Sequence, residues 1–198
     1  TTISPGIAET GLYGICRIGS DYGIIAGDTA STKFYYVRDS AIQISMNLDD
    51  YYFYGPVAGD LDRDSMPEVV VATADGWVKT ISVDTSALTA TQQYDTVDDS
   101  IFVNPIISDI DQDGFPDIIL GGKNKIFALN HNLLNVLNFP ITIDQAYPNS
   151  IVVSSPVVGD INNDGIKDVI AMISTGTCYA FSGQYDINYE LNYGYELH

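Results

Sequence analysis

The chain has 198 residues and carries 8 Lys and Arg against 26 Asp and Glu, so its formal net charge is −18 at pH 7. This charge repels nucleic acids and anionic membrane surfaces, and no apolar run approaches the roughly 18–20 residues that insertion into a bilayer requires. Because 45% of the residues are hydrophobic and only 17% are charged, we expect residues 1–198 to fold as a single domain with a substantial core.

The first predicted unit, at residues 12–48, contains three short strand-like runs. They are Tyr22–Gly27, Lys33–Val37 and Ala41–Ser45, each too short for a helix and rich in the residue types that strands prefer. The segment Cys16–Asp21 before them is too short and too poor in carboxylates to hold a cation. We therefore interpret this unit as a degenerate form of the repeats that follow.

Three acidic loops recur after this unit at a spacing of about fifty residues. Their first aspartates are Asp60, Asp109 and Asp160, which lie 49 and 51 residues apart. A fixed period of this length is typical of repeat architectures. The loops divide the remaining chain into units at about 49–98, 99–148 and 149–198.

Each acidic loop is followed by an apolar run, a turn and a second run with aromatic residues, which predicts two paired strands. The predicted pairs are Val69–Thr73 with Trp77–Ser82, Ile118–Gly122 with Lys125–Asn130, and Val169–Ile173 with Thr177–Ser182. Further strand-like runs at Ala87–Tyr94 and Ile141–Ile143 indicate about four strands in each unit. Leu133–Leu137 is also more typical of a strand than of a helix, because asparagines surround its apolar residues.

All-β units of this size with four short strands predict a β-propeller of about four four-stranded blades. Four blades are few for a propeller, so the chain is either a closed small ring or part of a larger propeller. In a closed ring, Tyr185–Tyr195 pairs with the strand around Gly11–Cys16, and a disulfide between Cys16 and Cys178 becomes plausible. The alternative is that both cysteines are small buried apolar residues.

The acidic loops have the spacing of calcium-binding loops, with side-chain oxygens at positions 1, 3, 5 and 9 and a glycine or serine at position 6. The residue at position 7 adds a backbone carbonyl. The predicted ligands are Asp60, Asp62, Asp64, Met66 and Glu68 in the first loop, Asp109, Asp111, Asp113, Phe115 and Asp117 in the second, and Asp160, Asn162, Asp164, Ile166 and Asp168 in the third. We therefore expect about three Ca²⁺ ions with a structural role.

The donor types favour calcium over other metals. Oxygen donors without imidazole or thiolate argue against zinc and copper, and a flexible cage of several carboxylates argues against magnesium. An EF-hand is excluded, because position 12 of each loop falls inside an apolar strand. Ser65 replaces the glycine of the first loop, and a serine with positive φ costs about 1 kcal/mol, so we expect this site to be the weakest.

At these residues the sequence resembles the FG-GAP and VCBS-type repeats, the calcium-binding blades of integrin α subunits and of bacterial surface and secreted proteins. The resemblance covers Pro56–Ser182 well and residues 12–37 weakly, and Ser154–Gly165 together with Tyr179–Gly183 looks most like the bacterial form. It implies a calcium-binding loop between the first and second strands of a blade, an extracellular location, and protein or glycan ligands. The Phe-Gly half of the integrin motif is missing.

The leading functional hypothesis is a non-catalytic extracellular module, secreted or on the cell surface, for adhesion or for binding a protein or glycan. A start at Thr1 fits a mature secreted chain or an excised fragment. One alternative is a self-assembling cell-surface or filament subunit, in which Tyr185–Tyr195 adds as a strand to another chain. Another is the propeller part of a calcium-dependent polysaccharide lyase, although the chain has only 2 histidines and few basic residues.

Two groups of aromatic residues are candidates for a glycan site. The first comprises Tyr51, Tyr52, Phe53 and Tyr54, and the second comprises Tyr185, Tyr189, Tyr193 and Tyr195. The competing interpretation is that these rings fill the space between blades, because aromatic residues are common in strands.

Overall fold

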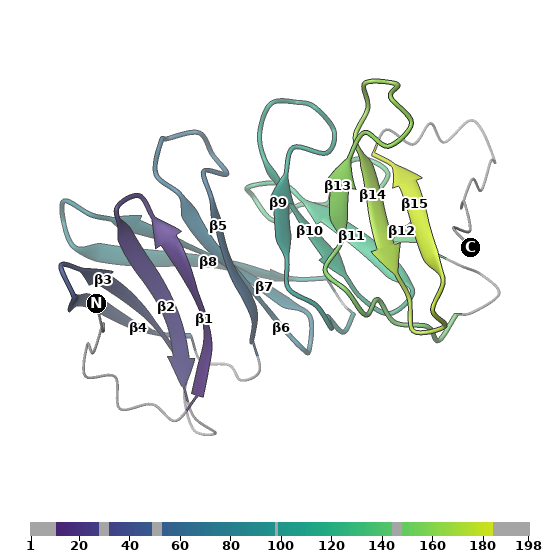
Figure 1. Cartoon of the computed structure of the whole chain (residues 1–198). Helices are drawn as coiled ribbons and strands as arrows, with labels where there is room; N and C mark the ends of the chain where they lie inside the picture. Colours follow the sequence, from purple (N-terminus) through teal and green to yellow (C-terminus); the bar gives the residue numbers. More distant parts are fainter. Residues whose placement is uncertain (1–10, 28–31, 49–52, 98, 144–147, 184–198) are drawn as a thin grey trace.

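The computed structural model describes residues 11–27, 32–48, 53–97, 99–143 and 148–183 (Figure 1). These residues form fifteen strands in four antiparallel sheets and contain no helix. Accordingly, the described residues contain no helix that is long and apolar enough to cross a membrane. The predicted all-β fold is confirmed.

The first and second sheets each have four strands in chain order. The first consists of β1 (Gly11–Ile18), β2 (Asp21–Gly27), β3 (Thr32–Arg38) and β4 (Ala41–Asn47). The second consists of β5 (Phe53–Gly59), β6 (Glu68–Thr73), β7 (Trp77–Asp84) and β8 (Thr89–Thr96).

The third and fourth sheets follow the same order. The third consists of β9 (Ile106–Ser108), β10 (Asp117–Gly121), β11 (Lys125–Leu129) and β12 (Ile141–Thr142). The fourth has three described strands, β13 (Val157–Gly159), β14 (Asp168–Met172) and β15 (Cys178–Ser182). The predicted strand at 185–195 lies outside the described residues.

The predicted hairpins form with their partners in register. Val69 pairs with Ile81, Ile118 with Leu129, and Val169 with Phe181. The segment 133–137 differs from its prediction: it is a turn that makes only an isolated bridge between Leu129 and Asn135.

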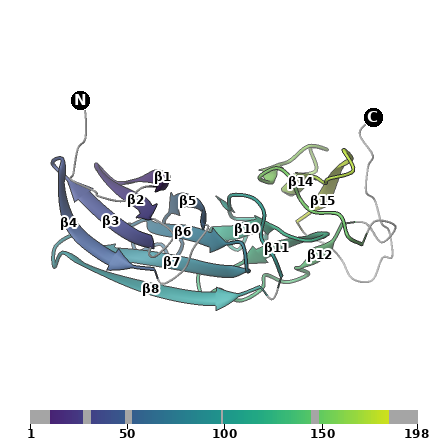
Figure 2. The ribbon, with the colours of Figure 1, turned by 90° about the horizontal axis from the view of Figure 1, so that it is seen from below.

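The four sheets are arranged as an open arc. The first strands stand next to one another, with β1 against β5 and β5 against β9 (Figure 1). Figure 2 shows the first and fourth sheets at opposite ends of this arc. The closed small ring is therefore wrong for the described chain, and the arrangement is that of a partial propeller.

Neighbouring sheets stack face to face and bury their strands on both sides. Val69 and Val71 of β6 face the core shared with the first sheet, whereas Val70 and Ala72 face the core shared with the third sheet. All four side chains are completely buried. This explains why the second strand of a unit appears in the sequence as an uninterrupted apolar run rather than an alternating one.

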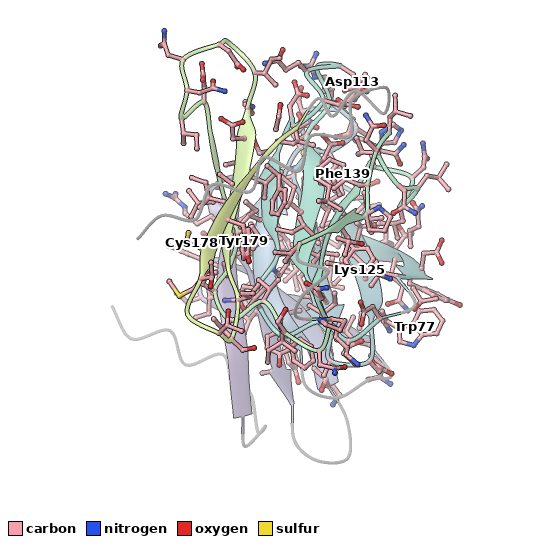
Figure 3. The ribbon with its side chains drawn as sticks, turned by 90° about the vertical axis from the view of Figure 1, so that its right-hand side faces the viewer. Trp77, Asp113, Lys125, Phe139, Cys178 and Tyr179 are labelled. Atoms are coloured by element: carbon pink, nitrogen blue, oxygen red, sulfur yellow. The ribbon has the colours of Figure 1, made fainter. Side chains whose placement is uncertain are left out.

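The two cysteines are free thiols at opposite ends of the arc, so the disulfide alternative is wrong. Cys16 is half-buried in β1 and its Sγ donates to the Gly23 carbonyl at 3.7 Å. Burial raises the pKa of the Cys16 thiol to about 11. Cys178 lies on β15 in the fourth sheet, at the near edge of the molecule in Figure 3.

The aromatic residues offered as a glycan site are mostly outside the described residues, namely Tyr51, Tyr52 and the four C-terminal tyrosines. The side chain of Phe53 is also not described. Tyr54 packs against the core between the second and third sheets, as expected if the rings fill the space between blades.

A glycine allows the third and fourth sheets to approach each other closely. A Cβ at Gly121 would lie 2.5 Å from Cγ1 of Val152 and 2.7 Å from its Cβ. Since Val152 is completely buried, it has little space into which to move. We expect Gly121→Ala to lower the free energy of unfolding by about 1–3 kcal/mol in urea titrations.

Gly159→Ala is the matched control for this substitution. No described atom lies within 4 Å of a Cβ at Gly159, and the residue does not have a positive φ. Its substitution should leave the urea midpoint nearly unchanged. Equal losses in the two variants would contradict a role for Gly121 in sheet packing.

Candidate metal centre

The three acidic loops lie along one edge of the arc, at the top of Figure 1. Each connects the first strand of a sheet to the second: β5 to β6, β9 to β10, and β13 to β14. This is the position that the sequence resemblance implied. The equivalent connection in the first sheet, between β1 and β2, is a turn at residues 19–20.

All three loops are folded by the same side-chain-to-backbone hydrogen bonds. The side chain at position 1 accepts from the amide at position 6, and the side chain at position 3 accepts from the amide at position 5. The side chain at position 5 accepts from the amide at position 7, and the side chain at position 9 accepts from the amide at position 2. In the second loop the donors are the amides of Gly114, Asp113, Phe115 and Ile110, at distances from 2.7 to 3.1 Å. The acidic residues therefore shape the loop besides offering oxygen atoms.

Two positions in each loop have left-handed backbone conformations. The sequence predicts a left-handed conformation at position 6, where the φ angles of Ser65, Gly114 and Gly165 are 74°, 95° and 85°. It does not predict one at position 4, whose residues are Arg63, Gln112 and Asn163, yet their φ angles are 63°, 62° and 61°. Only Asn163 is a residue type with some preference for this conformation.

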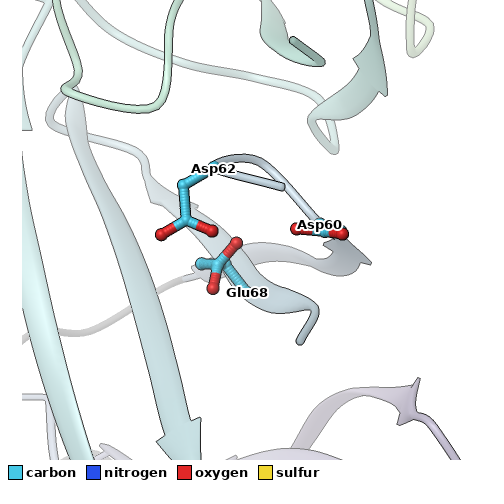
Figure 4. Close-up of side chains that lie close together, drawn as sticks. All are labelled: Asp60, Asp62 and Glu68. Atoms are coloured by element: carbon cyan, nitrogen blue, oxygen red, sulfur yellow. The ribbon is translucent and has the colours of Figure 1, made fainter. Parts of the chain in front are cut away.

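Acidic side chains converge in the first two loops. Oxygens of Asp60, Asp62 and Glu68 lie within 4.8 Å of one another, and Figure 4 shows the carboxylates of Asp62 and Glu68 side by side with Asp60 nearby. Oxygens of Asp109, Asp111 and Asp117 converge within the same distance. The remaining predicted acidic ligands, Asp64 and Asp113, are not part of these groups. Three of the four acidic residues predicted as ligands in each of these two loops therefore lie together, and their role as metal ligands stays a prediction.

One carboxylate oxygen in each of these two clusters has no hydrogen-bond partner. Oδ1 of Asp60 and Oδ1 of Asp109 are buried and unpaired. A buried unpaired carboxylate oxygen costs several kcal/mol, and two carboxylates 4.8 Å apart repel by about 3 kcal/mol at an effective dielectric constant of about 20. A cation among these oxygens removes both penalties, so the residues present fit a hard divalent metal ion.

The third loop uses its oxygens differently. Oδ1 of Asp160 accepts from the amide of Asp164 at 3.1 Å, and Nδ2 of Asn162 donates to Oδ2 of Asp164 at 2.9 Å. Both Asp160 and Asp164 are exposed. A third group of three converging acidic side chains does not occur in the described part of the chain. A metal at this loop, and the carbonyl ligands of Met66, Phe115 and Ile166, stay predictions.

The carboxylate at position 9 is the most perturbed group of each loop. Burial, followed by repulsion from neighbouring aspartates, raises the pKa of Asp117 to about 7. The same causes raise the pKa of Glu68 and of Asp168. Each accepts one hydrogen bond from the amide at position 2, at 2.9–3.0 Å, which opposes the shift without cancelling it.

The first sheet has an ion pair in place of an acidic loop. Asp21 begins β2 as Glu68 begins β6, and its Oδ2 accepts from Nε of Arg38 at 3.1 Å and from the hydroxyl of Tyr36. Arg38 follows Val37, which pairs with Tyr22, just as Ser82 follows Ile81, which pairs with Val69. These bonds, first that from Tyr36, lower the pKa of Asp21. Sequence reasoning missed this network, because only strand register shows that Arg38 lies opposite Asp21.

Comparison with protein families agrees with the loop geometry. The model of the FG-GAP-like repeat family matches residues 74–171. This part of the chain is an FG-GAP-like repeat. The matched FG-GAP region includes the second and third acidic loops, and the first loop shares their hydrogen-bond pattern. No curated protein is similar enough to be matched to the chain.

The raised pKa of Asp117 predicts how stability of the metal-free protein depends on pH. Folded Asp117 keeps its proton up to about pH 7, whereas unfolded Asp117 loses it near 3.8. The folded state therefore binds more protons between these values, so the free energy of unfolding should fall as pH rises, by up to about 1.4 kcal/mol per pH unit from this group. Urea titrations in chelator between pH 4 and 8 measure this slope.

Two substitutions separate Asp117 from the general acidity of the chain. Asp117→Asn removes the titrating group and should flatten the slope. Asp39→Asn removes an exposed aspartate outside the loops and should leave the slope as it is. The assignment to Asp117 fails if both variants keep the full pH dependence.

Proposed function

We propose that this chain is an extracellular, calcium-stabilised β-propeller module that binds a protein or glycan ligand and has no catalytic activity of its own. The observation that carries the proposal is the pair of buried, unpaired oxygens on Asp60 and Asp109, each inside a cluster of three acidic groups. They occupy the same place in two consecutive blades, which supports a repeated binding loop over two coincidental acidic turns.

Calcium is the ion that suits these clusters best. The donors are carboxylate oxygens on a loop that is itself held by hydrogen bonds, and calcium accepts six to eight such oxygens at 2.3–2.6 Å in variable geometry. When bound, the ion supplies positive charge that offsets the mutual repulsion of the carboxylates. Asp60, Asp62 and Glu68 would hold one ion, and Asp109, Asp111 and Asp117 another.

The extracellular location is supported by the calcium requirement and by the repeat type. Loop sites of this kind have Kd values of about 10⁻⁴–10⁻³ M in extracellular modules, which match millimolar calcium outside cells. At 2 mM free calcium, which is about two to twenty times such a Kd, each ion adds roughly 0.7–1.8 kcal/mol to stability. FG-GAP repeats are also typical of extracellular proteins.

The arrangement of polar groups supports a binding role over catalysis. The acidic side chains of each loop point into their own loop and accept bonds from its amides. His131 packs its ring against Phe115 at 5.5 Å and contacts the neighbouring Asn132. No Ser-His-Asp arrangement or phosphate-binding loop is present in the sequence.

The calcium part of the proposal predicts a specific binding pattern. We expect isothermal titration to show two tighter ions, at the first and second loops, and a weaker third ion or none. Calcium at 2 mM should raise Tm by roughly 3–14 °C over chelated protein. Asp60→Asn and Asp109→Asn should each remove one of the tighter ions, whereas the control Asp39→Asn should remove none. If the chain binds no calcium at millimolar concentration, the proposed metal sites are wrong.

The ligand part is tested by separate binding screens. The calcium-loaded chain, labelled on Lys, should bind a subset of glycans or extracellular proteins on an array, with signals that decrease in chelator because the blades loosen. Incubation with uronate polysaccharides should yield no unsaturated sugar products. Formation of such products would instead establish the polysaccharide lyase alternative.

A further inference from the structure

The tryptophan of this chain lies outside the cores between the sheets. Trp77 is the only tryptophan in the sequence, and it begins β7, where it is partly exposed. It belongs to none of the apolar clusters of the described residues. Strand register places Lys125 and Thr177 at the equivalent position of the next two sheets. The repeat itself therefore does not require an aromatic residue at this position.

Trp77 forms an aromatic pair with Tyr94 of the neighbouring strand β8. The two ring centres are 5.7 Å apart and the rings meet edge to face, at an angle of 69°. Thr96 pairs across the strands with Trp77, and Tyr94 with Lys79, so these four side chains lie on one side of the sheet. Tyr94 is 58% exposed, and Figure 3 shows Trp77 at the outer margin of the molecule. We call the rings of Trp77 and Tyr94 the aromatic platform.

A buried lysine holds the Tyr94 ring in place. Nζ of Lys79 lies 5.7 Å from the ring centre, and it donates a hydrogen bond to the carbonyl of Leu48. Because Lys79 is buried and bonded, its ammonium group is fixed, and its attraction to the π electrons orders the ring. The ring thus loses its rotamer freedom before any ligand arrives, which favours binding.

Polar side chains border the aromatic platform. The exposed Thr96 lies opposite Trp77, and the exposed Asp75 lies in the turn before it. Gln92 follows the same side of β8 two residues before Tyr94, and its buried Oε1 has no hydrogen-bond partner among the described residues. These groups offer hydroxyl, carboxylate and amide atoms, which pair with the hydroxyl groups of a ligand.

The charge around the aromatic platform disfavours anionic ligands. Asp75 and Asp95 are exposed carboxylates next to the two rings, and the whole chain has a net charge of −18. The cation at this place, Lys79, is buried and already bonded to a carbonyl, so it does not offer its charge to a ligand. Uronate, sulfated and sialylated sugars are therefore repelled, whereas neutral sugars are not.

We propose that the aromatic platform binds a neutral oligosaccharide, with a sugar ring stacked on Tyr94 and Trp77. A pyranose presents C–H groups on its faces and hydroxyl groups at its rim, which matches exposed aromatic rings bordered by polar side chains. The proposal rests on the proposed ligand-binding function and names a neutral glycan as the ligand. Figure 3 shows Trp77 and Asp113 of the second acidic loop toward opposite ends of the molecule, so the platform is separate from the loops.

A protein partner is a poorer occupant of the aromatic platform. A stable protein interface buries about 800 Å² on each partner, whereas the apolar surface here is limited to two rings. The neighbours of Tyr94 on β8, Gln93 and Asp95, are polar and exposed. The apolar surface therefore does not continue along the strand.

The fluorescence of the single tryptophan tests the proposal. The calcium-loaded chain is first applied to an array that carries neutral oligosaccharides of glucose, galactose, mannose and N-acetylglucosamine beside uronate and sialylated oligosaccharides. We expect binding to at least one neutral member and none to the acidic members. The strongest neutral binder is then titrated, and it should change the emission of Trp77 in a saturable manner.

Substitutions locate the bound sugar. Tyr94→Ala and Trp77→Ala should each raise the Kd roughly tenfold or more in isothermal titration, because each removes a stacking surface. Tyr94→Phe keeps the ring and should retain most of the affinity. Leu137→Ala, at a 77% exposed leucine between β11 and β12, is the control and should not change the Kd. Tm measurements check that each variant is folded at the temperature of the assay.

Three results would overturn the assignment. Neutral oligosaccharides fail to bind, or they bind with an unchanged Kd in Tyr94→Ala and Trp77→Ala, or the platform instead binds an extracellular protein whose affinity Tyr94→Ala removes. In the second and third cases the chain still binds a ligand, so the proposed function stands while this assignment is wrong. If the chain binds neither glycans nor proteins, both are wrong.

Discussion

Each sheet in this protein must be covered on both faces, and the rest of the structure depends on that requirement. A single four-stranded sheet cannot remove enough apolar surface from water to offset the entropy of ordering its chain. Stacking solves this, because one strand such as β6 supplies side chains to two cores at once. The cost is that the ends of the stack are different from its middle. The close packing around Gly121 shows how little free space the interior of the stack contains.

The acidic loops also differ in how far the next sheet covers them. The loops of the second and third sheets are partly buried, and there the carboxylates converge and leave an unpaired oxygen on Asp60 and Asp109. The loop of the fourth sheet is exposed, and there Nδ2 of Asn162 donates to Asp164, while Oδ1 of Asp160 accepts from the backbone amide of Asp164. The third loop differs from the other two both in exposure and in sequence, because Asn162 stands where they have Asp62 and Asp111.

The sequence predicted what is local or periodic. Apolar runs and the fifty-residue period gave the strands and the repeated loops, and glycine or serine at position 6 gave one left-handed residue. It did not show the left-handed conformation of position 4, because Arg63 and Gln112 are not residues that favour it. The contact of Arg38 with Asp21 depends on strand register. Openness of the arc depends on sheet-to-sheet geometry, which composition does not encode.

The ion pair of the first sheet has a consequence for how the whole chain loses order. Arg38 is a covalently attached cation that cannot dissociate, so the charge on Asp21 is balanced whatever ions the solution contains. In the second and third sheets, the proposed counter-charge for the acidic clusters is a diffusible ion. In a linear stack of repeats, where each unit is stabilised mainly by its neighbours, this gives the molecule a polarity. If the loops bind calcium as proposed, removing the ion destabilises the later sheets first, and the amino-terminal sheet is the last to lose its order.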